Sequence, residues 1–210
     1  MAEIPWLVFI AASLVVIVAP GQDLVLVMSR GLGQGSAAGV TSAAGVSTGL
    51  LGHTALAALG LGALISASQT AFLILKIVGG CYLVYLGIRA ILSARESLSF
   101  SQSSGTSLRK LFVQGALSNI SNAKIVLFYF AYLPQFVPAS VADPTLEIAL
   151  LGSLFALLTF IVKAPVGFFS GQLSHWINNH PRVLAWINRL SGGLLIGLGL
   201  RLALAEGEAA

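Results

Sequence analysis

The sequence predicts an all-helical integral membrane protein, and three features of its composition and patterning lead to that class. Of 210 residues, 57% are hydrophobic and only 9% are charged, whereas a soluble domain carries about 25% charged residues. Mean hydropathy is +0.93. The apolar runs are long and continuous, while the strands of a membrane barrel would alternate apolar and polar residues. Because backbone groups inside a bilayer must be satisfied within the structure, such runs form helices.

Six apolar segments are long enough to cross a membrane, which takes about 20 mostly apolar residues. The predicted spans are residues 4–28, 37–65, 70–92, 110–134, 146–173 and 184–205. The first span lacks the basic leading region and the small-residue cleavage site of a signal peptide. We therefore expect it to be retained as a helix.

Basic residues gather in three of the five connections between these spans. They are Arg30 in the first, Arg89, Arg95, Arg109 and Lys110 in the third, and Arg182 and Arg189 in the fifth. Since Lys and Arg favour cytoplasmic loops, we expect these connections in the cytoplasm and both termini outside. This distribution explains the pI near 9.6 without a nucleic-acid partner. The single cysteine, Cys81, excludes an internal disulfide and a thiolate metal cluster.

The chain divides into two similar units, residues 1–92 and 110–210, joined by a Ser-rich linker at 93–109. "KIVGGCYLVYLGIRAIL" from Lys76 and "RLSGGLLIGLGLRLAL" from Arg189 share a basic residue, a Gly-Gly pair and, after one deletion, a Gly-x-Arg. "GQDLVL" from Gly21 likewise parallels "NAKIVL" from Asn122. A three-helix unit repeated in tandem enters the membrane from opposite sides. The sequence thus predicts two inverted three-helix repeats, an arrangement typical of secondary transporters.

The stretch "VAPGQDLVLVMS" predicts an interruption of the first span, at Pro20, Gly21 and Gln22. Proline lacks an N–H and glycine relaxes the backbone. Asp23 follows directly, and a charge near the bilayer centre costs about 2.5–3.5 kcal/mol, so its side chain must pair or face a cavity.

The fourth span carries the matching features. Asn119, Ser121 and Asn122 are expected to interrupt this helix with side-chain amides and a hydroxyl, and Lys124 aligns with Asp23. We expect Asp23 and Lys124 to face one another across a pseudo-twofold axis. Such a centre suits a zwitterion, whose ammonium would pair with Asp23 and whose carboxylate would take Lys124 and free N–H groups at a helix start. The alternative is a permanent Asp23–Lys124 salt bridge that only fixes the fold.

Two more polar residues lie deep in predicted spans and extend this candidate site. His53, in the second span, can carry a proton near neutral pH, or be a hydrogen-bonded packing residue. Lys163, in the fifth span, can join the site or snorkel to the surface. We expect no metal or cofactor, because the sequence has no HExxH, P-loop or metal-ligand cluster.

The glycines predict tight packing between helices, and one motif that contains glycine suggests a different function. Small-xxx-small pairs, which let helices approach closely, occur at Gly35/Gly39, Gly45/Gly49, Gly167/Gly171 and Gly193/Gly197. "GVSTG", from Gly45 to Gly49, also matches G-x-S-x-G, which with His53 and Asp23 would suggest an intramembrane serine hydrolase. That motif requires a strained turn at the serine, but here it lies in a continuous apolar run.

Across nearly its whole length the sequence resembles the LysE/RhtB family of bacterial amino-acid exporters. The resemblance rests on "APGQDLVLVMSRGLGQGSAAG", "GHTALAALGLGALISAS", "LKIVGGCYLVYLGIRA", "SNISNAKIVLFYFAYLPQFV" and "HPRVLAWINRLSGGLLIGLGLRLAL". The family usually reads PGPD and NPK in the first and fourth of these stretches. Gln22 and Ala123 occupy the two proline positions here, while Asp23, Asn122 and Lys124 match.

The resemblance implies export of amino acids or their derivatives across the inner membrane, driven by a proton gradient. The family's substrates include basic amino acids, threonine, homoserine and homoserine lactone. In this chain, Asp23 or His53 would carry the proton. The expected partners are thus a small amino acid, protons and the bilayer; the oligomeric state, including a homo-oligomer, stays open. The alternatives are an inorganic-cation exporter, which would need more than one intramembrane acid, the serine hydrolase, and a non-transporting scaffold.

Overall fold

The computed structural model describes residues 4–92, 105–138, 141 and 143–204, and within these the chain is helical, without a strand. The elements are α1 (Trp6–Val18), α2 (Gln22–Gln34), α3 (Ser36–Ala67), α4 (Gln69–Leu92), α5 (Leu108–Ile120), α6 (Ala123–Leu127), η2 (Phe128–Tyr132), η3 (Leu133–Phe136), α7 (Thr145–Phe168), α8 (Ser170–Asn179) and α9 (Pro181–Leu204). The predicted all-helical class is confirmed. Most of the predicted linker, residues 93–104, lies outside the described residues.

Five of the six predicted spans correspond to candidates for membrane crossing among the described residues. Three helices are long and apolar enough by themselves: Thr70–Leu92, Thr145–Phe168 and Arg182–Leu204. Two pairs are bent at a short break, α1 with α2 by 56° and α5 with Ala123–Phe136 by 53°, and each pair can form one broken span. The remaining predicted span corresponds to α3, whose 32 residues extend about 48 Å at 1.5 Å per residue. Its passage through the membrane stays a prediction.

Both predicted helix breaks are present, although each lacks one proline that is usual in the family, at Gln22 in the first and at Ala123 in the second. In the first, α1 ends at Val18 and α2 begins at Gln22, after Gly21 in a fully extended conformation. Gln22 is therefore the first residue of α2 and not part of the break. In the second, Asn122 caps α6, because its Oδ1 accepts a hydrogen bond from the Lys124 N–H at 3.2 Å. An amide side chain thus starts the second half-helix.

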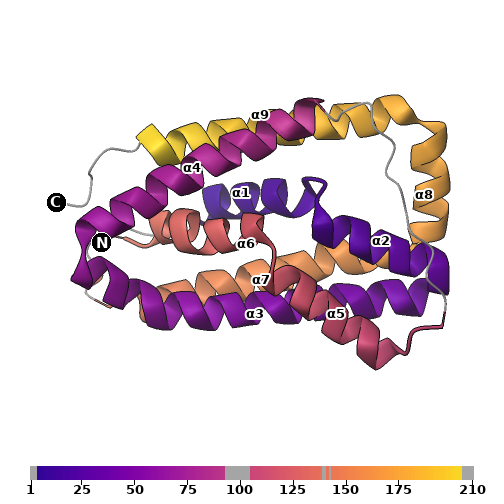
Figure 1. The fold of residues 1–210 in the computed structure, drawn as a ribbon, viewed down its shortest axis with the longest axis horizontal. Helices are drawn as coiled ribbons and strands as arrows, with labels where there is room; N and C mark the ends of the chain where they lie inside the picture. Colours follow the sequence, from indigo (N-terminus) through magenta and orange to yellow (C-terminus); the bar gives the residue numbers. More distant parts are fainter. Residues whose placement is uncertain (1–3, 93–104, 139–140, 142, 205–210) are drawn as a thin grey trace.

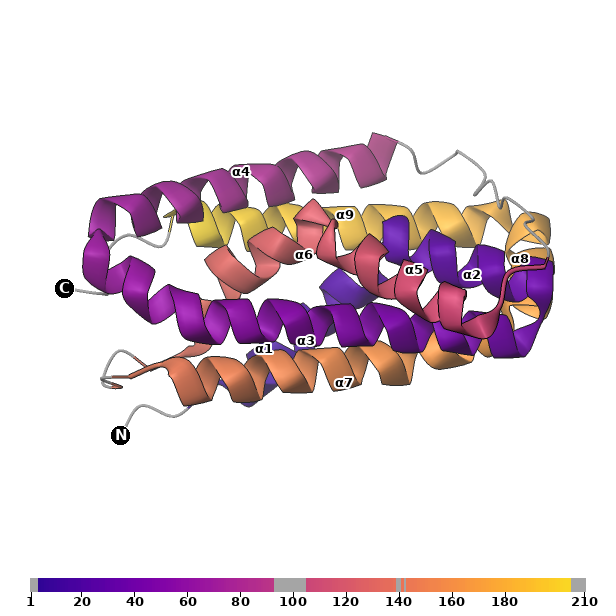
Figure 2. The same ribbon diagram turned by 60° about the horizontal axis from the view of Figure 1, so that its bottom comes forward.

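Two antiparallel helix pairs flank the broken helices (Figures 1 and 2). In the first pair, α3 and α7 touch at Gly39 and Gly167, where a Cβ on Gly167 would lie 2.6 Å from the Gly39 carbonyl carbon. In the second, α4 and α9 touch at Gly87 and Gly192, with an equally close approach. The absence of side chains at these points lets backbones meet. The broken helices are therefore held between two tightly joined pairs.

The predicted small-residue pairs are confirmed only in part. Gly39, Gly45, Gly49 and Gly167 each lie against the backbone of another helix. A Cβ on Gly171, Gly193 or Gly197 would meet nothing within 4 Å. Gly35 has a φ of +88°, which favours glycine, and ends α2 rather than packing against a neighbour. Spacing alone therefore did not indicate which face of a helix carries the contact.

One end of the bundle is covered by α8, which turns away from α7 after Phe169 (Figure 1). The predicted span 146–173 is wrong at this end, because α7 stops at Phe168 and Ser170 already belongs to α8. The turn is fixed by packing on α2, where Met28 and Ile177 share a buried apolar cluster. The hydroxyl of Ser36 also donates to the Phe168 carbonyl at 2.7 Å.

The connections with basic residues lie at this same end of the molecule. The turn between α2 and α3, the start of α5, and α8 with the start of α9 all gather there (Figure 1). The turn between α3 and α4 and the start of α7 lie at the opposite end. This arrangement agrees with the predicted orientation, in which the basic end faces the cytoplasm.

Candidate functional site

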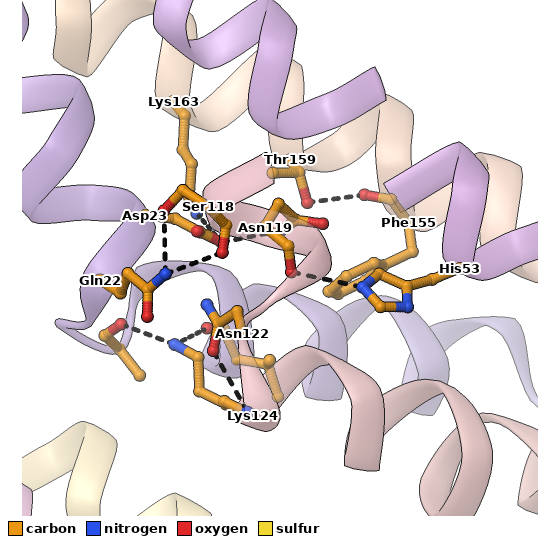
Figure 3. Close-up of polar contacts among 12 residues, drawn as sticks. Gln22, Asp23, His53, Ser118, Asn119, Asn122, Lys124, Phe155, Thr159 and Lys163 are labelled. Atoms are coloured by element: carbon orange, nitrogen blue, oxygen red, sulfur yellow. Dashed lines mark hydrogen bonds and ion pairs between the residues drawn. The ribbon is translucent and has the colours of Figure 1, made fainter. Parts of the chain in front are cut away.

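Asp23 lies at the first helix break, as the second residue of α2, with only 2% of its surface exposed. Its Oδ2 accepts a hydrogen bond from Asn119 Nδ2 at 2.8 Å and forms an ion pair with Lys163 Nζ at 3.4 Å (Figure 3). Asn119 is in the last turn of α5, and Lys163 is in α7. Three elements that are far apart in the sequence therefore converge on one carboxylate.

Asp23 forms its ion pair with Lys163 and not with Lys124, so the alternative of a permanent Asp23–Lys124 salt bridge is wrong in this conformation, and the base that the substrate centre needs is already at the carboxylate on another helix. Lys163 is 4% exposed and its ammonium points inward rather than snorkelling to the surface. The reason is the packing of α7, which runs along α3 and meets α2 near Val27 and Ala164. That contact brings the residue preceding Ala164 to the start of α2.

Lys124 has a different role, because it binds the backbone at the end of α1. Its Nζ donates to the carbonyl oxygens of Val16 and Ala19, each at 3.1 Å (Figure 3). In a continuous helix the N–H of residue 20 would reach the Val16 carbonyl, but proline has no N–H. The lysine on the second half-helix therefore satisfies an acceptor that Pro20 leaves open.

A further contact ties the two breaks together. Gln22 Nε2 donates to the backbone oxygen of Ser118 at 2.8 Å and to its hydroxyl at 3.0 Å. With the Asp23–Asn119 bond and the Lys124 contacts, three residues link the α1–α2 break to the α5–α6 break (Figure 3). The breaks thus form one polar centre, as the sequence predicted, although with different pairings.

His53 lies beside this centre, on α3, and is 3% exposed. Its Nε2 is 3.3 Å from the Asn119 backbone oxygen, and this is a hydrogen bond when Nε2 carries the proton. Because the Asn119 side chain binds Asp23, His53 reaches the carboxylate only through that residue. A neighbouring polar pair had no signal in the sequence: Tyr129, on η2, donates to the Gly152 carbonyl at 3.0 Å and lies 3.1 Å from the Thr54 hydroxyl.

Several buried polar atoms at this centre have no protein partner. They are Asp23 Oδ1, Asn119 Oδ1, Asn122 Nδ2 and His53 Nδ1. Buried polar atoms in folded proteins are nearly always paired with protein or ordered water. These adjoining residues have hydrogen-bond acceptors and a donor without a protein partner. They therefore indicate a place where a polar ligand or water binds.

Ser47, the serine of the G-x-S-x-G match, lies inside α3, which is helical from Ser36 to Ala67. No residue other than glycine has a positive φ in the described chain. The strained turn that exposes a hydrolase serine is therefore not formed at this motif.

Comparison with known proteins agrees with this architecture. The family model of the LysE type translocators matches residues 14–206. A membrane protein of Vibrio cholerae that is named only as uncharacterized is 30% identical, with 96% of this chain and 97% of that protein covered. A homoserine/homoserine lactone efflux protein of Salmonella typhimurium is also 30% identical, over 96% and 97%. A leucine efflux protein of Enterobacter sp. (strain 638) is 26% identical, over 94% of each chain.

No solved structure matches the chain significantly. The apolar helices and these relatives identify a multi-pass protein of the bacterial inner membrane. Because the family model covers almost the whole sequence, the chain belongs to the LysE type translocator family.

Proposed function

We propose that this translocator exports a small neutral amino acid or a close derivative from the cytoplasm, by proton antiport. The observation that carries the proposal is the buried Asp23–Lys163 ion pair at the meeting point of two interrupted helices. Relatives named as homoserine and leucine efflux proteins support the substrate class. Both named amino acids are zwitterions with one ammonium and one carboxylate, which suits one acid facing one base.

The substrate's ammonium binds Asp23 Oδ1 and Asn119 Oδ1, two buried acceptors that lack a protein partner. Its carboxylate takes the Lys163 ammonium and the free N–H groups at the start of α2, where the helix dipole favours an anion. The substrate thereby replaces an internal ion pair with two equivalent pairs. The protein's own two charges are buried before and after the exchange and keep a partner throughout, so only the substrate's ions have to be desolvated, at several kcal/mol each, and their new pairs offset that cost.

Proton antiport follows from competition for one carboxylate. A proton that reaches Asp23 from outside neutralises it and releases the substrate ammonium, and loss of that proton to the cytoplasm restores the site for the next substrate. His53 contacts the Asn119 backbone oxygen, and the Asn119 side chain donates to Asp23. A backbone carbonyl and a side-chain amide do not pass a proton to one another, so His53 positions Asn119 while Asp23 itself carries the exchange.

The test is export from cells preloaded with labelled homoserine, threonine, leucine or lysine. Asp23→Asn and Lys163→Met should abolish export, while Lys110→Ala, which removes an exposed lysine at the start of α5, should keep it. Membrane levels of each variant must be equal. Wild-type rates in Asp23→Asn would contradict the site assignment, and a protein that exports lysine but not neutral amino acids would contradict the substrate class.

The alternatives have no observation of their own in the described residues. An inorganic-cation exporter would need a cluster of ligands, and no group of three or more His, Cys, Asp or Glu side chains that could hold a metal occurs there. The hydrolase lacks its turn at Ser47. Amino-acid export remains the function that the site supports best.

A further inference from the structure

We propose that the broken end of α1 is a binding site for a primary ammonium group, and that Lys124 occupies it from within the chain. The Lys124 ammonium donates to Val16 O and Ala19 O at 3.1 Å each. This places a positive charge at the negative end of the α1 dipole. The proposal concerns a site separate from the Asp23–Lys163 pair and does not depend on which substrate is exported.

Val16 O is open because of Pro20, and Ala19 O is open because α1 ends there. The last carbonyls of a helix lack partners within it, and the N–H of Ala19 satisfies only Val15 O, at 3.0 Å. The next donor along the chain would be residue 20, where proline has none. Two carbonyls therefore face the gap, and a donor from α6 fills it.

Gly21 makes room for the ammonium. A Cβ at this position would lie 3.2 Å from Lys124 Nζ and 3.8 Å from its Cε. Gly21 is fully extended, with φ of −172°, so its backbone conformation does not require glycine. A side chain here would instead press on the lysine, whose ammonium would have to shift by a few tenths of an ångström.

The geometry selects an ammonium over a bare metal cation. Both N···O distances are within the range of ordinary N–H···O hydrogen bonds, whereas a small metal cation would need shorter contacts and more ligands. In transporters with broken helices, unwound carbonyls of this kind coordinate the coupling cation. Here they are already taken, so Lys124 acts as a tethered counter-cation that holds α6 against the end of α1.

The experiment replaces the tethered cation with a free one. Lys124→Ala keeps Cβ and removes the Cγ, Cδ and Cε methylene groups and the ammonium, and n-propylammonium carries the same three carbons and the same charge. We expect n-propylammonium chloride to raise the thermal midpoint of purified full-length Lys124→Ala in a saturable way, by roughly 2–4 °C or more. Tetramethylammonium, which has the charge but no N–H donor, should have no such effect.

Three controls decide the outcome. Wild type and Lys110→Ala should not respond, because the site is filled, and Lys124→Ala combined with Gly21→Val should not respond, because the added side chain occupies the space. Equal responses to n-propylammonium and tetramethylammonium, or equal responses of Lys124→Ala and wild type, would overturn the proposal.

A second pair of variants keeps the test decisive if Lys124→Ala does not fold. Lys124→Met retains a long side chain without the donor, whereas Lys124→Arg retains donors and charge. The arginine variant should have the higher midpoint. A methionine variant as stable as wild type would mean that the ammonium does not hold the break, and would overturn the proposal without any transport measurement.

Discussion

Asp23 meets its counter-ion on a helix far along the sequence, and this pairing determines how the site responds to substitution. Both side chains are almost fully buried, at 2% and 4% exposure. Removing one partner of a buried pair leaves an uncompensated charge, which costs about 3–5 kcal/mol, whereas removing both charges together is often neutral. Stability and transport should therefore separate in a double-mutant cycle.

We expect Asp23→Asn and Lys163→Met each to lower the unfolding free energy by about 3–5 kcal/mol, and the double variant to be markedly more stable than either. Export should be lost in all three, because the substrate then lacks at least one charge partner. Thermal unfolding in detergent and export from preloaded cells measure the two properties. A double variant no more stable than the worse single variant would show that the two side chains do not form a pair.

The polar residues of the site could be recognised in the sequence, because ionisable and amide groups are costly inside an apolar run. Their partners could not. Successive residues turn by about 100° around a helix, so whether Lys124 or Lys163 meets Asp23 depends on rotations that packing decides. Tyr129 and Thr54 gave no signal, since such residues are ordinary in apolar helices and only their contacts with each other single them out.

At the scale of elements, the half-helices α2 and α6 start in different ways. The first position of α6 has no proline, although its geometry would accept one. Ala123 is the first residue of α6, it is exposed, and Asn122 before it is extended, with φ of −83° and ψ of 101°. Proline is favoured at the first helical position, where the N–H has no intrahelical partner.

Ala123→Pro should therefore raise the unfolding free energy by about 0.4–1 kcal/mol, by restricting the unfolded chain. Gln22→Pro is the matched control, because it stands at the same position of α2 but removes the side chain that donates twice to Ser118. Its gain should be cancelled by the lost hydrogen bonds, which contribute about 0.5–1.5 kcal/mol each. Thermal midpoints of both variants decide this, and destabilisation by Ala123→Pro would contradict the described start of α6.

The helix breaks were predictable because Pro20, Gly21 and Asn122 are local signals that act on their own backbone. The turn into α8 was not. Ser170 and Gly171 are a turn signal. However, Phe168, Phe169 and Leu173 around them continue the apolar character of α7, so the predicted span includes this stretch. The turn depends on contacts with α2 and α3, including the Ser36 hydroxyl on the Phe168 carbonyl, which only the assembled molecule brings together.

For the whole molecule, the contacts between α4 and α9 support the proposed inverted repeat and refine its register. Gly80 lies against Gly199, and Gly87 lies against Gly192. A twofold axis exchanges these two contacts if Gly80 corresponds to Gly192 and Gly87 to Gly199. This correspondence needs no deletion, unlike the alignment drawn from the Gly-Gly pairs. The feature that the two halves share is then the glycines at which the backbones of α4 and α9 meet, rather than the Gly-Gly pair.

Inversion of two three-helix units requires α3 to cross the membrane, and this can be tested through topology. If α3 spans, the turn at Ser68 lies outside and the turn at Gln34 lies in the cytoplasm, with the other basic connections. Fusions of alkaline phosphatase, which is active only outside the cytoplasm, should be active after Ser68 and after Leu204 and inactive after Gln34 and after Asn179. Fusions of a fluorescent protein that matures only in the cytoplasm should give the reverse pattern. Equal phosphatase activity after Gln34 and Ser68 would mean that α3 does not cross, so that the two halves would enter the membrane in the same direction and the shared centre at Asp23 would lack its symmetric origin.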